Sequence, residues 1–210
     1  MKRGIFFLMI ASIFLALPTG CGNNVQKVQR GSWGSFSVSY LDVLGSAFEN
    51  AQWSQVKDES GENVVQFNGA ISQSIHDYAV EKLKASDPKL VFQSACSYLA
   101  ALNRDGRIAK EKGITFDYSK LPMKQGIVIF ERISPFMNDP ANKDIVTALD
   151  EFYLNRYWEA NSNVTIQWGV YSGGKIIKIK KISNIHWDDD PLYSGKPDSV
   201  MRIVYDYYRK

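Results

Sequence analysis

Histidine and cysteine are scarce in this chain, and their scarcity restricts the chemistry it can perform. Only two histidines, His76 and His186, and two cysteines, Cys21 and Cys96, occur among 210 residues. Acid–base catalysis near neutral pH therefore has few candidate residues. The sequence also contains no CxxC pair, no Walker-type loop, and no GxGxxG or GxSxG pattern. These absences leave no sequence signature of a nucleotide site, a redox dithiol or a hydrolase nucleophile.

A strong excess of one charge is lacking as well. The chain has 25 basic and 22 acidic residues, and removal of residues 1–20 would leave 23 basic residues and a net charge of +1. A nearly neutral protein does not present the basic surface typical of nucleic-acid binding, so no nucleic-acid partner is expected. What the chain does have is apolar material, since 45% of its residues are hydrophobic and 13% are aromatic. That content is enough for one packed core.

The N-terminus resembles the export signal of bacterial lipoproteins. Lys2 and Arg3 precede an uncharged, mostly apolar run over residues 4–17, which has the length of a signal peptide and is short for a membrane-spanning helix. Gly20 and Cys21 match the lipobox, whereas Pro18 stands where an aliphatic residue is usual. The resemblance implies a signal peptide over residues 1–20 and a lipid (palmitate among its acyl chains) on Cys21. The protein would then be anchored to a membrane of the cell envelope, on its periplasmic or surface side. Ordinary signal cleavage and a retained anchor are the alternatives.

The clearest structural signal is a hairpin over residues 163–187. Apolar and polar residues alternate from Val164 to Val170, which predicts a strand with two distinct faces. A Ser-Gly-Gly-Lys turn follows at 172–175, and an isoleucine-rich return strand runs from there to Ile185. Lys178 and Lys180 are expected to share a solvated, basic face of this strand and to form a contact surface for a partner.

A second hairpin is predicted near residues 53–70, and it carries a resemblance. Gly45, Ala47 and Phe48, then Trp53, then the NVVxFxG stretch over residues 63–69 resemble a domain recurrent in exported, mostly uncharacterised bacterial proteins. Its outline is similar to the helix-and-sheet modules of β-lactamase inhibitory proteins and of small outer-membrane assembly lipoproteins. The resemblance implies an antiparallel sheet with helices and says little about activity.

Helical periodicity marks most of the remaining chain. We predict helices over residues 43–50, 75–85, 88–102, 145–157 and from 197 to near the C-terminus, and a strand over 127–133. The last helix is expected to cover the apolar face of the hairpin at 163–187. Residues 21–37 are polar and rich in Gly and Ser, and are predicted to be a linker after the lipid. Residues 38–210 are expected to form one α+β domain, an antiparallel sheet flanked by helices, with residues 72–158 as a helical insertion.

Three groups of residues could carry chemistry. Ser74, His76 and Asp77 are the residue types of a catalytic triad, but neighbours along one helix do not converge as a triad must. His186 with Asp188–Asp190 could bind a divalent cation, although consecutive carboxylates cannot all reach one ion. Cys96 lies in an apolar helical stretch and is expected to be a buried, unreactive thiol. If Cys21 is not lipidated, a Cys21–Cys96 disulfide is an alternative.

The sequence therefore favours a non-catalytic cell-envelope lipoprotein that binds an envelope protein or acts as an inhibitor-like module. No cofactor or metal is expected. A metal-dependent hydrolase at His186 and Asp188–Asp190, or a carrier of a small ligand, is the alternative. Aromatic side chains left outside the core could add to the contact surface. The candidates are Trp33, Trp53, Trp158, Trp168, Trp187, Tyr205, Tyr207 and Tyr208.

Overall fold

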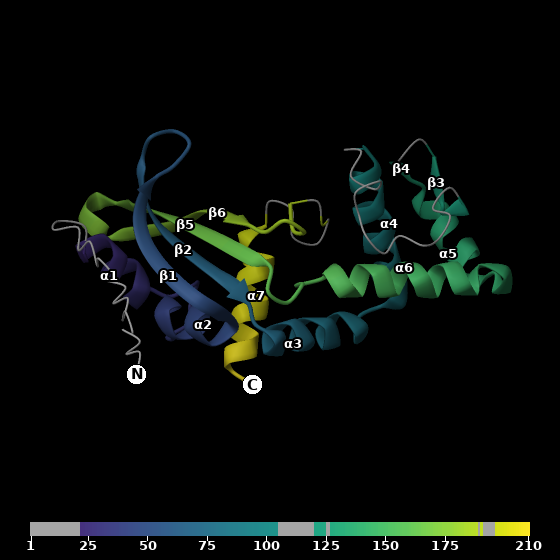
Figure 1. The fold of residues 1–210 in the computed structure, drawn as a ribbon, viewed down its shortest axis with the longest axis horizontal. Helices are drawn as coiled ribbons and strands as arrows, with labels where there is room; N and C mark the ends of the chain where they lie inside the picture. The colour runs from purple at the N-terminus through teal and green to yellow at the C-terminus, as the bar shows by residue number, and fades with distance from the viewer. Residues whose placement is uncertain (1–21, 105–119, 125–126, 189, 191–195) are drawn as a thin grey trace, which may run out of the picture.

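A four-stranded antiparallel sheet is the centre of the fold. The structure, a computed structural model, describes residues 22–104, 120–124, 127–188, 190 and 196–210. The strands follow the order β1-β2-β5-β6, so both predicted hairpins are confirmed and the class is α+β (Figure 1). The sheet is built from β1 (Phe48–Lys57), β2 (Asn63–Ile71), β5 (Asn163–Tyr171) and β6 (Ile176–Ser183).

The pairing of β2 with β5 puts the most apolar residues on one face. Val65 lies opposite Trp168 and Phe67 opposite Ile166, and all four side chains are buried. The residues between them face the other way and form a polar ladder, in which Gln167 Nε2 donates to Gln66 Oε1 at 2.7 Å. This division into one apolar and one polar face follows from the period of two along each strand.

Three helices cover the apolar face of the sheet. They are α1 (Gly22–Arg30), α2 (Tyr40–Ala47) and α7 (Pro197–Tyr208). Ser39 caps α2, since its hydroxyl accepts the Asp42 N–H at 3.2 Å. The ring of Tyr40 packs on Trp168 at 5.3 Å and on Tyr205 of α7 at 6.4 Å, which joins both helices to the sheet. The predicted cover by the last helix is therefore present, together with two further helices.

The linker prediction for residues 21–37 is wrong over the part that the structure describes. Residues 22–30 form helix α1, and Val28 on it is fully buried in the core. Trp33 then stacks on Phe36 at 5.4 Å. A few well-spaced apolar groups are enough to dock this polar segment, because tertiary packing rather than local propensity stabilises most helices. The helix predicted over 43–50 also begins earlier, and Phe48 already belongs to β1.

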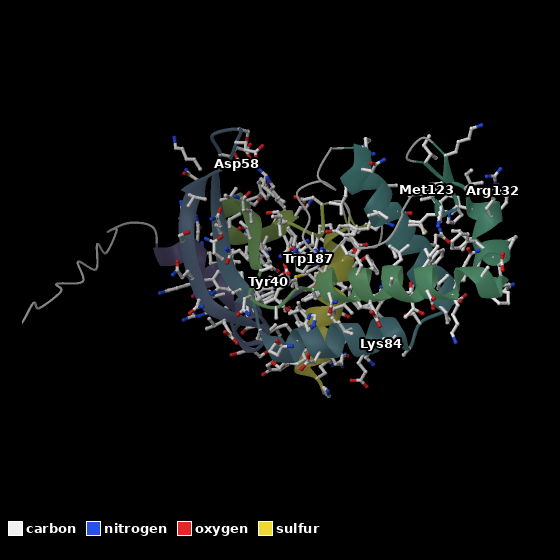
Figure 2. The ribbon with its side chains drawn as sticks, turned by 45° about the vertical axis from the view of Figure 1, so that its right-hand side comes forward. Tyr40, Asp58, Lys84, Met123, Arg132 and Trp187 are labelled. Atoms are coloured by element: carbon white, nitrogen blue, oxygen red, sulfur yellow. The ribbon has the colours of Figure 1, made fainter. Side chains whose placement is uncertain are left out.

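The chain between β2 and β5 forms a helical arm that extends away from the sheet (Figure 1). Helices α4 and α6 pack along each other, and their residues Phe92, Leu99 and Leu149 extend the hydrophobic core of the sheet into the arm. The elements are α3 (Gln73–Lys84), α4 (Pro88–Arg104), β3 (Met123–Lys124), β4 (Ile127–Val128), α5 (Phe130–Asn138), η3 (Pro140–Asn142) and α6 (Lys143–Arg156). Figure 2 places Met123 and Arg132 at the far end of this arm.

The strand predicted over residues 127–133 is also wrong beyond its start. Only Ile127 and Val128 pair, and helix α5 begins at Phe130. Ile133 is buried and Phe136 stacks on Phe92 of α4 at 5.8 Å, so residues three apart face the same neighbour. A short apolar run fits a strand or a buried helix equally well, and packing against α4 decides between them here.

Candidate functional site at the edge of strand β6

Strand β6 ends the sheet on one side and holds the lysines that the sequence singled out. Its residues pair with β5 on one side only. Among the described residues, no hydrogen bond joins its backbone to any group outside that hairpin. An edge of this kind presents unused N–H and C=O groups that another strand can pair with.

A β-bulge in this strand changes which lysines face outward. Ile179 lies opposite Trp168 and Lys181 lies opposite Gln167, so Lys180 is the extra residue. The simple alternation that placed Lys178 and Lys180 on one face is interrupted at this point. Lys178 shares the polar face with Lys181, and all three lysines are exposed.

An acidic loop folds across the polar face and holds two of the three lysines. Lys180 Nζ donates to Asp58 Oδ2 at 2.5 Å and to Glu62 Oε2 at 2.6 Å, and Lys181 Nζ donates to Glu59 Oε1 at 2.8 Å. The bonds from Lys180 and from Ser60 hold the pKa of Asp58 well below its usual range. Figure 2 shows Asp58 on this loop, beyond the end of the strands. Lys178 makes no ion pair with a described residue, so it is the lysine left available to a partner.

The apolar side of β6 is only partly covered. Ile177, Ile179 and Ile182 lie on the core face but remain partly exposed, whereas Val164, Ile166 and Trp168 on β5 are fully buried. The three helices thus fill the core up to β5 and leave apolar surface along β6. Partly exposed isoleucines beside a free strand edge are typical of a binding surface rather than of a sealed core.

Two adjoining depressions follow this edge, and together we call them the β6 groove. The first, of about 350 Å³, is lined by residues that include Trp33, Tyr40, Ile177 and Ile179. The second, of about 250 Å³, is lined by residues that include Ile182, Trp187, Lys196 and Val200. Pro197 at the start of α7 lines both. The groove therefore lies between β6 and the N-terminal end of α7.

His186 connects the arm to the sheet through both of its ring nitrogens. Its Nε2 lies 2.5 Å from Glu159 Oε2 and its Nδ1 lies 3.0 Å from the hydroxyl of Tyr98 on α4, so both ring nitrogens have protein partners. Asp190 is buried and accepts the hydroxyl of Tyr153 at 2.6 Å. Asp189 lies outside the described residues, and within the described ranges no three His, Cys, Asp or Glu side chains gather as a metal site would require.

The other residues considered for chemistry do not converge either. His76 Nδ1 lies 2.8 Å from the carbonyl oxygen of Trp158, Ser74 accepts the hydroxyl of Tyr207 at 2.8 Å, and Asp77 accepts the amide of Gln73 at 2.8 Å. Each side chain thus has a different partner, and no triad forms. Cys96 is fully buried as expected, and burial raises the pKa of its thiol to about 12.

Most of the aromatic residues turn out to be core residues. Trp158, Trp168, Trp187 and Tyr205 are buried, and Figure 2 shows Trp187 inside the body of the molecule. Trp33, Trp53 and Tyr207 are partly buried, and Tyr208 is exposed. Of these, only Trp33 and Trp187 line the β6 groove. The broad aromatic contact patch is therefore replaced by two tryptophans that flank a strand edge.

Sequence reasoning missed the partners of His186 and the extent of the groove. Glu159 is 27 residues and Tyr98 is 88 residues from His186, and no local pattern connects them. The prediction of a linker over residues 21–37 did not anticipate that Trp33 contributes to the groove. The free edge itself was foreseeable only in part, since strand order depends on pairings that local periodicity does not determine.

Comparisons with protein families, with curated proteins and with solved structures found no match for this chain. Among the described residues, none of the helices combines the length and the apolar character needed to cross a bilayer. Cys21 and the predicted signal peptide before it lie outside the described residues.

Proposed function

We propose that this chain is a non-catalytic lipoprotein of the bacterial cell envelope, tethered through Cys21, that binds a protein partner at the edge of β6. The observation that carries the proposal is the β6 groove, in which an unpaired strand edge lies beside partly exposed isoleucines. Such an edge offers main-chain hydrogen bonds for affinity and adjacent pockets for side-chain specificity. The Gly20-Cys21 pair after a signal-like segment supports the tether.

The state of the potential catalytic groups supports a binding role. A general base must be able to reach the proton that it removes, and a nucleophilic thiol must ionise. His186 and His76 have structural partners, and burial keeps the Cys96 thiol protonated. The two histidines therefore have structural roles, and the Cys96 thiol is unsuited to act as a nucleophile.

The proposal is tested by reconstitution. The mature, tagged protein is cross-linked in cells of its source, the recovered partner is purified, and association of the two isolated proteins is measured by sedimentation. A defined complex is expected, and its loss in a variant with an altered β6 edge would locate the contact. The metal content of the purified protein is measured in parallel. A stoichiometric divalent cation together with hydrolytic activity would contradict the proposal and favour the metal-dependent hydrolase.

A further inference from the structure

We infer that the ligand of the β6 groove is an extended segment in which apolar and acidic side chains alternate, and that it pairs with β6 as a fifth strand. The inference rests on the proposed function and names the class of partner at the same site. It follows from what each side of β6 presents to an added strand.

An added strand would place alternate side chains on the two faces of the sheet. On the helix side these side chains would enter the groove beside the partly exposed Ile177, Ile179 and Ile182. Trp33 is partly exposed there, the buried Trp187 and Val200 form part of the wall, and charged residues such as Asp198 and Lys196 lie at its rim. Burying a large apolar side chain contributes roughly 1.5–3 kcal/mol. The helix side of the groove therefore favours apolar residues at every second position.

On the polar face the added strand would lie beside Lys178, which no described acidic residue neutralises. Lys180 and Lys181 already have carboxylate partners from the loop over residues 58–62. Opposite charges on neighbouring strands stabilise a pair, and like charges directly opposite destabilise it. The polar side thus favours acidic residues at the remaining positions and disfavours basic ones.

A second copy of this chain does not fit the edge. Lysine occupies three of the four positions from 178 to 181, so antiparallel pairing of two β6 strands would bring lysines opposite or diagonal to lysines. Lysines on edge strands are a known obstacle to such self-association. Lys178, which no described carboxylate neutralises, attracts an acidic side chain instead, so the edge favours a partner of different sequence.

The other edge of the sheet is less suited to strand addition. On β1 the register shifts between Glu49 and Gln52, and Asn50 has a positive φ of 53°. β6 also contains a bulge, at Lys180, but among the described residues only the bulge of β1 includes a residue with a positive φ, which further disturbs the regular spacing of backbone groups. Lys57 at the end of β1 is an exposed lysine on this edge and provides a matched control.

The test uses the mature protein and synthetic peptides of about ten residues, a length that exceeds a typical strand. One peptide alternates valine with glutamate, a second alternates valine with lysine, and a third has the residues of the first in blocks. Fluorescence anisotropy measures the dissociation constants for the protein and for its Lys178→Glu and Lys57→Glu variants. Thermal unfolding confirms that each variant is folded, and hydrogen exchange of the β6 amides reports pairing directly.

The valine–glutamate peptide is expected to bind and to protect the β6 amides, while the block peptide binds more weakly. Lys178→Glu should weaken binding about five- to tenfold, because one cross-strand attraction becomes a repulsion. The same variant should gain affinity for the valine–lysine peptide, and Lys57→Glu should change neither.

Equal binding of both alternating peptides, an unchanged affinity in Lys178→Glu, or no protection of β6 would overturn the inference. The two proposals fail separately. If the reconstituted partner binds Lys178→Glu as well as the original protein, the strand-addition inference is wrong and the binding function stands. If no protein partner can be reconstituted, the binding function is wrong whatever the peptides do.

Discussion

Asp150 is a carboxyl group that the fold keeps away from water. It lies on α6, and its Oδ1 is buried without a hydrogen-bond partner among the described residues. Burial raises the pKa of Asp150 to about 6, because a charged carboxylate is disfavoured there. Its negative charge in turn adds to the raised pKa of Cys96. Asp150 therefore makes the stability of the arm sensitive to pH, whereas the Cys96 thiol stays protonated at neutral pH.

Replacing this carboxyl should stabilise the protein at neutral pH. The folded state holds the proton of Asp150 up to a pH of about 6, whereas an unfolded aspartate releases it near 3.9, so the free energy of unfolding falls as the pH rises between these values. Asp150→Asn should raise the free energy of unfolding at pH 7 by about 1–3 kcal/mol and leave it nearly unchanged at pH 4. Urea unfolding at both pH values measures this. A less stable variant at pH 7 would mean that the ionised carboxylate has a stabilising partner.

Two glycines of the sheet, Gly69 and Gly169, differ in what a Cβ added to them would contact. A Cβ on Gly69 would lie 2.9 Å from the Cβ of Phe48 and 2.9 Å from the ring of Phe67, inside the core. A Cβ on Gly169 would also meet a ring, that of Tyr171, but Tyr171 is exposed and can turn away. Close packing in the core therefore explains the glycine at position 69, whereas a larger residue can replace Gly169.

The matched substitutions test this difference. Gly69→Ala should lower the free energy of unfolding by about 1–3 kcal/mol, since the core must shift to admit a methyl group. Gly169→Ala should change it by less than about 0.5 kcal/mol, as substitutions near a movable surface side chain do. Denaturant unfolding of both variants gives the comparison. Equal losses would show that Tyr171 is held in place.

At the scale of elements, His186 is the connection between the arm and the sheet. It receives contacts from α4 through Tyr98 and from the segment after α6 through Glu159. His186→Leu should lower the free energy of unfolding by about 1–3 kcal/mol, because both hydrogen bonds are lost in a partly buried place. The substitution should also increase the rate of amide hydrogen exchange more in α4 and α6 than in the sheet.

Tyr207→Phe is the control for this prediction. It removes a single exposed hydrogen bond to Ser74, so it should leave both the stability and the exchange of the arm nearly unchanged. If His186→Leu leaves the exchange of α4 and α6 unchanged as well, other contacts hold the arm in place.

The elements that the sequence predicted well are those with a strong period and clear ends. Residues 164–170 alternate between apolar and polar, Gly174 in the turn that follows has a positive φ of 95°, and Pro88 and Pro197 each begin a helix. The segment at 127–133 has no such signal, and its helix depends on contacts with α4. Likewise α1 depends on Val28 reaching a core that only the assembled sheet provides. The β6 groove could be predicted no further than its lysines, because its walls come from segments distant in the sequence.

At the scale of the whole molecule, the proposed lipid on Cys21 gives a direct prediction. If Cys21 carries the lipid, the mature protein should fractionate with membranes and its N-terminal peptide should carry the mass of acyl chains. Cys21→Ser should release it from the membrane without lowering its melting temperature, since every residue of the described core follows Cys21 in the chain. An N-terminal peptide of unmodified Cys21, or a membrane-bound Cys21→Ser protein, would contradict the lipid anchor.

The start of helix α1 at Gly22 has a consequence for where such a protein can work. A lipid on the preceding residue would be attached next to the first residue of α1, without a linker between them. The sheet would then lie within about the length of α1 from the phospholipid headgroups, which is roughly 14 Å for nine residues. A lipid at this position would therefore keep the β6 groove near the bilayer, and only molecules that come close to the membrane surface would reach it.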